Sequence, residues 1–405
     1  TVWDLNQGLF YVYDAANYTT QIALSSIWTD EVGIGFANGG QGLSGEYSFV
    51  MNSGSYQPRG IWNSNYDLIN FSNRLLAAAE GITPEEGEEE VYNDILAQTR
   101  ALRAFGYFNL QTYFSPDLTD DSALGVILFD FVPSIADELP RSTNGEVFNF
   151  INEDLTFAEN NLADNTDVTY VTQDFITAMR ARMALYRENY TDAQTYAQEV
   201  INNVPLSPRA EYLDIWQDEA VGEVIFKLER TTGDDVIAGL WQSVNATISG
   251  SSFYEIGRAL FNELDPQDVR FDALVHPTSI IDPNYETSTD YRNDDILLIN
   301  KYPGSEGQNR LNDLKIFRAS EMYFIVAEAQ INAGNLEDAA ETLQTVRDIR
   351  YAPNNAPSQP TYANATQAWA DVLAERRIEL AFEGHRWVDL GRLGSKAQVQ
   401  VDRDE

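Results

Sequence analysis

The stretch ERRIELAFEGHRWVDLGR, residues 375–392, gathers acids, arginines and a histidine into one helix-like segment. Its charged positions recur every three or four residues: Arg376, Glu379, Glu383, Arg386 and Asp389. On one continuous helix, Glu379 and Glu383 would repel each other by about 0.2–0.5 kcal/mol unless the arginines paired with them. The spacing therefore predicts a chain of alternating charge along the helix, and Gly384 predicts a bend or a close backbone approach.

The same two glutamates could instead form the acid pair of a glycoside hydrolase. Such pairs flank an open cleft, are about 5–5.5 Å apart in retaining enzymes, and need one member with a raised pKa. Arginines beside Glu379 and Glu383 would lower both pKa values, which suits ion pairs and not a general acid. We therefore predict a structural role for this cluster and no catalytic residues in the chain.

The composition of the 405-residue chain excludes several classes of protein. It has no cysteine and two histidines, His276 and His385, so disulfides, thiolate metal sites and histidine-rich catalytic sites lack material. The formal net charge of −37 disfavours nucleic acid and anionic lipids as partners. We expect no cofactor and no metal, since the acidic stretch at 282–295 matches no EF-hand spacing.

Two segments that resemble each other predict helical hairpins. RENYTDAQTYAQEVI, residues 187–201, aligns with AGNLEDAAETLQTVR, residues 333–347, and each follows a segment with small residues. A helix, a short turn and a second helix that opens with Asp-Ala is the pattern of a tetratricopeptide hairpin. A further helix start is predicted where Ser142 or Thr143 can cap and Glu146 can complete a capping box.

Five segments carry a pattern that runs in order from about residue 60 to 394. They are IWNSNYDLINFSNRLL, RALRAFGYFNLQTYF, PRSTNGEVFNFINEDLTFAENNL, RASEMYFIVAEAQ and ERRIELAFEGHRWVDLGRLG. In the first, the spaced residues are Trp62, Tyr66, Ile69 and Asn73. Together the segments resemble the SusD/RagB family, the glycan-binding outer-membrane lipoproteins of Bacteroidetes, and the last resembles the C-terminal signature of that family.

The resemblance implies a mainly α fold, in which tetratricopeptide-like helical hairpins pack against a loop-rich, mixed variable half. The chain would then form a single SusD-like domain over residues 1–405. The hairpins are expected within about 60–115, 145–203 and 312–393. The variable, ligand-facing segments are expected within about 28–60 and 222–310.

The resemblance also implies a function. The family is non-enzymatic and captures oligosaccharides at the cell surface for a SusC-like TonB-dependent transporter. We therefore expect three partners: a glycan, that transporter and the outer membrane. The protein would be a surface-exposed lipoprotein, and because the chain has no cysteine, we expect its N-terminal lipid anchor to lie outside this sequence.

A neutral glucan is the expected ligand, because sugars stack their C–H faces on aromatic rings and bind polar side chains through their hydroxyls. Aromatic residues at helical spacing are expected in the core, so the platforms should lie on the polar, Gly-rich loops. The predicted ligand-binding residues are Trp241, Trp28, Asp30, Phe36, Asn38, Tyr47 and Tyr254. A peptide- or protein-binding helical scaffold without sugar affinity is the alternative. Exposed aromatic platforms on loops would favour the glycan.

Overall fold

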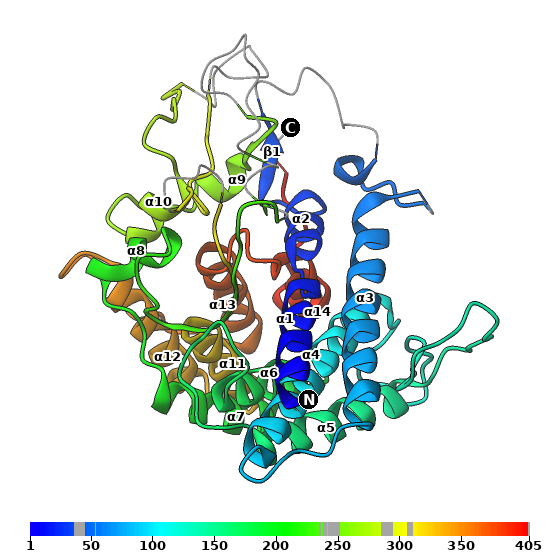
Figure 1. The fold of residues 1–405 in the computed structure, drawn as a ribbon. Helices are drawn as coiled ribbons and strands as arrows, with labels where there is room; N and C mark the ends of the chain where they lie inside the picture. The colour runs from blue at the N-terminus through cyan, green and yellow to red at the C-terminus, as the bar shows by residue number, and fades with distance from the viewer. Residues whose placement is uncertain are drawn as a thin grey trace. The chain divides into compact units, whose positions relative to one another are not determined.

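The protein, seen in a computed structural model, is mainly helical, which confirms the predicted fold class (Figure 1). The chain divides into two compact units. The first unit consists of Thr1–Tyr18, Tyr56–Asn203 and Ile225–Leu228, and the second of Thr19–Ser55, Val204–Val224 and Glu229–Glu405. The structure describes residues 1–35, 45–52, 54–234, 236–237, 241, 252–284, 295–305 and 311–403. The extent of a single domain stays a prediction.

The first unit is a set of packed helices. Its elements are α1 (Val2–Ala15), α3 (Tyr56–Ala79), α4 (Glu89–Phe114), α5 (Asn144–Asn161), α6 (Gln173–Tyr186), α7 (Tyr190–Asn203) and most of strand β2 (Val224–Leu228). Helix α4 contacts α1, α3, α5 and α6, and its carboxyl-terminal half is buried on nearly every side. Gly106 allows this packing, because a Cβ there would lie 3.2 Å from Ile69 Cγ1 and 3.3 Å from the Asn65 carbonyl oxygen.

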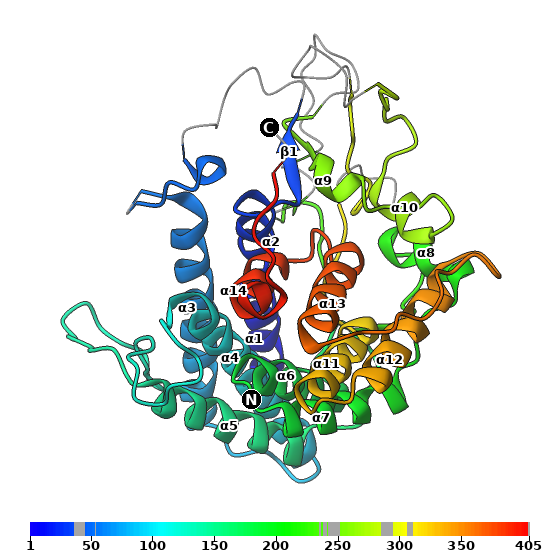
Figure 2. The ribbon, with the colours of Figure 1, turned by 180° about the vertical axis from the view of Figure 1, so that it is seen from behind.

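The second unit contains short strands and the carboxyl-terminal helices. Its helices are α2 (Thr19–Ile27), α8 (Tyr212–Trp216), α9 (Arg258–Phe261), α10 (Val269–Leu274), α11 (Ala319–Asn332), α12 (Leu336–Arg350), α13 (Ala365–Glu379) and α14 (Arg386–Ala397). Its strands are β1 (Val32–Ile34), β3 (Tyr254–Ile256) and β4 (Leu314–Arg318). Strand β1 pairs antiparallel with β3. Helices α11, α12 and α13 pack against one another (Figure 2).

The two segments predicted to repeat form the same turn. Between α6 and α7, Glu188 adopts a left-handed backbone (φ 56°), and between α11 and α12 Gly334 does the same (φ 83°). The amide of the next residue then donates to a carbonyl five positions earlier, at 2.9 Å in both turns. The hairpin repeat predicted from the sequence is therefore confirmed at the level of backbone hydrogen bonds.

The continuous helix predicted over residues 375–392 is wrong. Helix α13 ends at Glu379 and α14 begins at Arg386. Between them Phe382 (φ 62°) and Gly384 (φ 92°) have a left-handed backbone, so the chain turns where Gly384 predicted a bend. This conformation costs about 1–2 kcal/mol at Phe382, and the complete burial of its ring offsets that cost.

Helix α5 begins with the predicted capping box, and its cap is Thr143. Thr143 Oγ1 accepts a hydrogen bond from the Glu146 amide at 3.3 Å, and the Glu146 carboxylate accepts one from the Thr143 amide at 2.8 Å. The helix therefore starts with two of its amide groups satisfied.

Replacing Thr143 by alanine should lower the free energy of unfolding by about 1 kcal/mol, because the hydroxyl cap is lost. Urea unfolding measures this change. Thr195→Ala, at an exposed position inside α7, is the matched control and should change the free energy by less than about 0.5 kcal/mol. Equal effects of the two substitutions would contradict a capping role.

Candidate functional site

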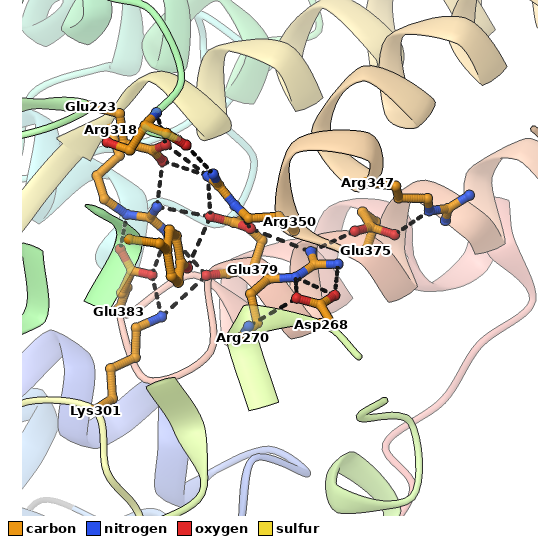
Figure 3. A network of polar contacts seen from close by, with 12 residues as sticks. Glu223, Asp268, Arg270, Lys301, Arg318, Arg347, Arg350, Glu375, Glu379 and Glu383 are labelled. Atoms are coloured by element: carbon orange, nitrogen blue, oxygen red, sulfur yellow. Dashed lines mark hydrogen bonds and ion pairs between the residues drawn. The ribbon is translucent and has the colours of Figure 1, made fainter. Parts of the chain in front are cut away.

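A buried ion-pair network lies in the second unit, with Glu379 near its centre (Figure 3). The Glu379 carboxylate accepts hydrogen bonds from Arg318 at 2.8 Å, from Arg350 at 3.0 Å and from Arg270 at 3.3 Å. Arg318 also donates two hydrogen bonds to Glu383, at 2.7 and 2.8 Å. The Glu379 carboxylate is thus bound by arginines from the end of strand β4 and from helices α12 and α10, which are distant from one another in the sequence.

The network places at least one carboxylate beside every cation. Its carboxylates are Glu223, Asp268, Glu375, Glu379 and Glu383, and its cations are Arg270, Lys301, Arg318, Arg347 and Arg350. Since all of these side chains are buried, each needs an opposite charge close by. Burial alone would raise the pKa of Glu379, but Arg350, Arg318 and Arg270 hold it well below its usual range. A carboxylate kept ionised in this way suits the predicted structural role.

The ion pairs predicted inside residues 375–392 are wrong in their partners. Arg376 pairs with Asp389 at 2.7 Å, although the continuous helix predicts a pair with Glu379. The turn at residues 380–385 moves the second half of the stretch away from the axis of α13. Glu379, Glu383 and Arg386 therefore meet partners from other elements, while Asp389 also pairs with Arg392 within α14 at 2.7 Å.

Asp30, a predicted ligand-binding residue, is engaged inside the protein. Its two carboxylate oxygens accept hydrogen bonds from Arg386, each at 2.8 Å, and the side chain is buried. Burial would raise the pKa of Asp30, but Arg386 and Arg377 hold it below its usual range. This geometry joins residue 30 to the start of α14 and differs from the predicted contact with a sugar.

The two predicted tryptophan platforms are buried. Trp241 is 2% exposed, and its ring centre lies 5.4 Å from that of Phe382. Trp28 is 3% exposed and meets Trp387 edge to face at 5.8 Å. This burial differs from the exposed platforms that we predicted, because Trp241 and Trp28 pack on rings from a distant part of the sequence.

Tyr47 and Tyr254 are two predicted residues that the structure brings together, with ring centres 6.3 Å apart. Arg403 lies 4.0 Å from the ring centre of Tyr47 and 4.1 Å from that of Phe49. Phe49 is 48% exposed and Tyr47 is partly exposed. We name Tyr47, Phe49, Tyr254 and Arg403 the surface aromatic cluster. The predicted residues Phe36 and Asn38 lie outside the described residues.

Short local structures position the rings of the surface aromatic cluster. Tyr254 opens β3 and lies opposite Ile34 in the antiparallel pair. Tyr47 lies in a single helical turn, Glu46–Ser48, and Phe49 follows it with a left-handed backbone (φ 57°). Such a conformation is uncommon for an aromatic residue and directs the chain out of the turn. The turn therefore presents Phe49 at the surface.

Arg403 holds the turn in place, and sequence analysis missed it. Its guanidinium donates hydrogen bonds to the carbonyl oxygens of Ile27, Thr29 (2.7 Å) and Tyr47. The residue lies near the end of the chain, and nothing in its sequence context indicates which segment it contacts. Sequence analysis also missed Phe49 as a site residue. The Gly- and Ser-rich composition around it indicated a loop, which is where exposed aromatic residues were expected.

In the surface aromatic cluster Phe49 and Tyr47 supply the accessible ring surface, while Tyr254 is buried at 7% exposure. Burial raises the pKa of Tyr254 to about 12, so its hydroxyl stays protonated near neutral pH.

Within the described part of the chain, no group of three or more His, Cys, Asp or Glu side chains is placed to hold a metal ion. Among the described residues, no helix has both the length and the apolar character needed to span a membrane.

Comparison with known proteins agrees with the motifs. The model of the SusD family matches residues 269–404. SusD-like protein P38 of Formosa agariphila is 25% identical over 386 residues, which cover 84% of this chain and 73% of P38. A SusD-like protein of Bacteroides ovatus is 22% identical over 378 residues, 82% of this chain and 64% of that protein.

Solved structures show the same fold. A SusD superfamily protein of Bacteroides thetaiotaomicron has a TM-score of 0.81 at 23% identity, covering 100% of this chain and 90% of that one. A laminarin-binding SusD-like protein has a TM-score of 0.73 at 22% identity, covering 98% of this chain and 92% of that one. The chain has the fold of the SusD superfamily, and the resemblance to the SusD/RagB family that its motifs predicted is confirmed, with the family model matching residues 269–404.

Glu31, next to Asp30, is a buried carboxyl group with an altered pKa. It accepts hydrogen bonds from Ser26 Oγ at 2.8 Å and from the Phe382 amide at 3.1 Å. Burial raises the pKa of Glu31 to about 7, although these two hydrogen bonds lower it. The folded protein therefore keeps a proton that the unfolded chain releases between about pH 4.5 and 7.

This group should make stability depend on pH in a known direction. The contribution of Glu31 is fully present below about pH 4.5 and is lost as the pH rises to about 7, a change of about 3 kcal/mol. We expect the stability of the wild type relative to Glu31→Gln to fall across this range in urea unfolding. Glu341→Gln, at an exposed position of α12, is the control and should show no such trend. A pH-independent difference for Glu31→Gln would contradict the shifted pKa.

Proposed function

We propose that this protein binds a neutral glycan at the bacterial cell surface without altering it chemically. The observation that carries the proposal is the surface aromatic cluster, where Arg403 lies on the exposed ring of Phe49 and the partly exposed ring of Tyr47, and buried Tyr254 packs near Tyr47. Aromatic faces suit the C–H faces of sugars, and tyrosine hydroxyls suit the sugar hydroxyls. The laminarin-binding neighbour supports a glucan as the first ligand to test.

The charge of the protein supports a neutral ligand. A formal net charge of −37 repels uronic or sulfated chains unless a basic patch faces them. The one cation of the surface aromatic cluster, Arg403, already donates to three carbonyl oxygens, so the cluster offers no free cation to an anionic sugar. A neutral polysaccharide or oligosaccharide is not repelled by the net charge and needs no free cation.

The family supplies the rest of the proposal. In this setting the bound glycan would be delivered to a SusC-like TonB-dependent transporter in the outer membrane, and the protein would be held there as a surface lipoprotein. No bond in the glycan would be cleaved. The glutamates of the carboxyl-terminal signature would therefore serve the fold and not the ligand, since their carboxylates are buried in ion pairs.

Calorimetric titration with laminarin, mannan, a polyuronate and a peptide mixture tests this function. We expect heat with a neutral glycan and no cleavage products after prolonged incubation. Phe49→Ala should weaken that binding by at least about tenfold, equivalent to about 1.4 kcal/mol, because an exposed stacking surface is lost. Phe10→Ala, at a comparably exposed position of α1, is the matched control and should bind as the wild type does.

The outcomes separate the alternatives. Heat with peptides and none with sugars would contradict glycan binding and favour the peptide-binding scaffold. Glycan binding that survives Phe49→Ala unchanged would contradict the surface aromatic cluster as its site while leaving the class of ligand intact.

A further inference from the structure

The first unit holds a groove of about 560 Å³ that is separate in sequence from the surface aromatic cluster. One wall is the exposed side of α3, with Trp62 and Tyr66. The other wall is formed by residues 127–139, in the segment between α4 and α5, and includes Phe129. These residues belong entirely to the first unit, so the groove does not depend on how the two units are placed.

The second wall is held rigidly although it belongs to no helix or strand. The Tyr66 hydroxyl donates to the carbonyl of Ile127 and accepts from its amide, both at 2.9 Å. The Tyr107 hydroxyl pairs with the carbonyl and amide of Phe129 in the same way, at 2.6 and 3.0 Å. Asn73 donates to the carbonyl of Phe131 at 3.0 Å. Side chains of α3 and α4 thus replace a neighbouring strand, and the groove is preorganised.

Aromatic rings form a continuous surface in the groove. The rings of Tyr66 and Phe129 are nearly parallel, with centres 5.7 Å apart and an interplanar angle of 12°. Trp62 lies 4.8 Å from Tyr66 and meets Phe114 edge to face at 5.0 Å. Trp62, Tyr66 and Phe129 are each only partly buried, so the ring surface is accessible from the groove.

Hydrogen-bond acceptors surround this ring surface. Asn70 Oδ1 is buried and has no hydrogen-bond partner among the described residues. Leaving such an atom unpaired costs about 1–3 kcal/mol, which a ligand hydroxyl would recover. Within the described part of the chain, no hydrogen bond or ion pair engages the exposed carboxylate of Asp67. Asp137 accepts one hydrogen bond, from the Ser134 amide at 2.6 Å, and keeps its other oxygen available.

We propose that this groove is a second glycan-binding site, which takes one or two neutral sugar units. Ring faces bounded by amide and carboxylate oxygens match the C–H face and the donor hydroxyls of a pyranose. No lysine or arginine lines the groove in the described part of the chain, and Arg141, whose charge acts on Tyr66, already donates to three carbonyl oxygens. The site rests on the proposed function and deepens it, since it adds a second place where the same class of ligand is held.

Titration of four proteins with short oligosaccharides of laminarin, mannan and xylan tests the groove. The proteins are the wild type, the groove variant Asn63→Ala/Asp67→Ala, the cluster variant Phe49→Ala, and the combination of all three substitutions. Asn63 and Asp67 are exposed, so the groove variant should fold normally. We expect each partial variant to keep one of two binding events, and the combined variant to lose both.

Asn70→Leu provides an independent test. Because it removes the unpartnered oxygen and keeps a similar volume, thermal stability should be maintained while groove binding weakens by at least fivefold. Glu153→Ala, at an exposed position of α5, is the matched control and should leave binding unchanged.

The results separate the two sites. A groove variant that titrates like the wild type, while Phe49→Ala lowers affinity, would overturn the groove and leave the proposed function intact. A wild type that binds none of these oligosaccharides would overturn the proposed function and the groove with it.

Discussion

The buried pairing of Glu379 with three arginines is the interaction on which the second unit depends. Charges in a protein interior are tolerated only when opposite charges and hydrogen bonds replace the lost water. The network meets this condition because each of its cations has at least one carboxylate partner. Its arginines come from β4, α10 and α12, and Lys301 comes from the segment between α10 and β4, while three of its carboxylates lie on α13 and the turn after it. The network thereby fixes how these elements pack, a constraint that apolar surfaces alone impose less specifically.

The turn that follows α13 transmits this constraint to the candidate site. Glu383 is held in the network, and in the same turn the Phe382 amide donates to Glu31 while the Phe382 ring packs on Trp241. Arg386, which lies two residues after Gly384, binds Asp30, and Asp30 lies just before strand β1. The carboxyl-terminal signature therefore supports the segment that leads to the surface aromatic cluster. Its acids are held in buried ion pairs and position the backbone next to this segment.

Features set by local sequence could be predicted, and features set by distant partners could not. The capping box at Thr143, the repeated hairpin turn and the bend at Gly384 depend on residues a few positions apart, and the structure has all three. The family motifs indicated the overall fold. The burial of Trp241 depends on Phe382, which reaches it only through a left-handed turn, and polar neighbours in the sequence gave no sign of that. Of the surface aromatic cluster, Tyr47 and Tyr254 were predicted as candidate residues, and Arg403 was not.

A double-mutant cycle between Glu379 and Arg350 tests the central claim most directly. The free energy of unfolding would be measured for the wild type, Glu379→Gln, Arg350→Met and the double variant. Because each single substitution leaves a buried charge without its partner, we expect the double variant to be more stable than the sum of the two single effects predicts, by at least about 2 kcal/mol. Additive effects, within about 0.5 kcal/mol, would show that the two charges do not depend on each other and would contradict the account.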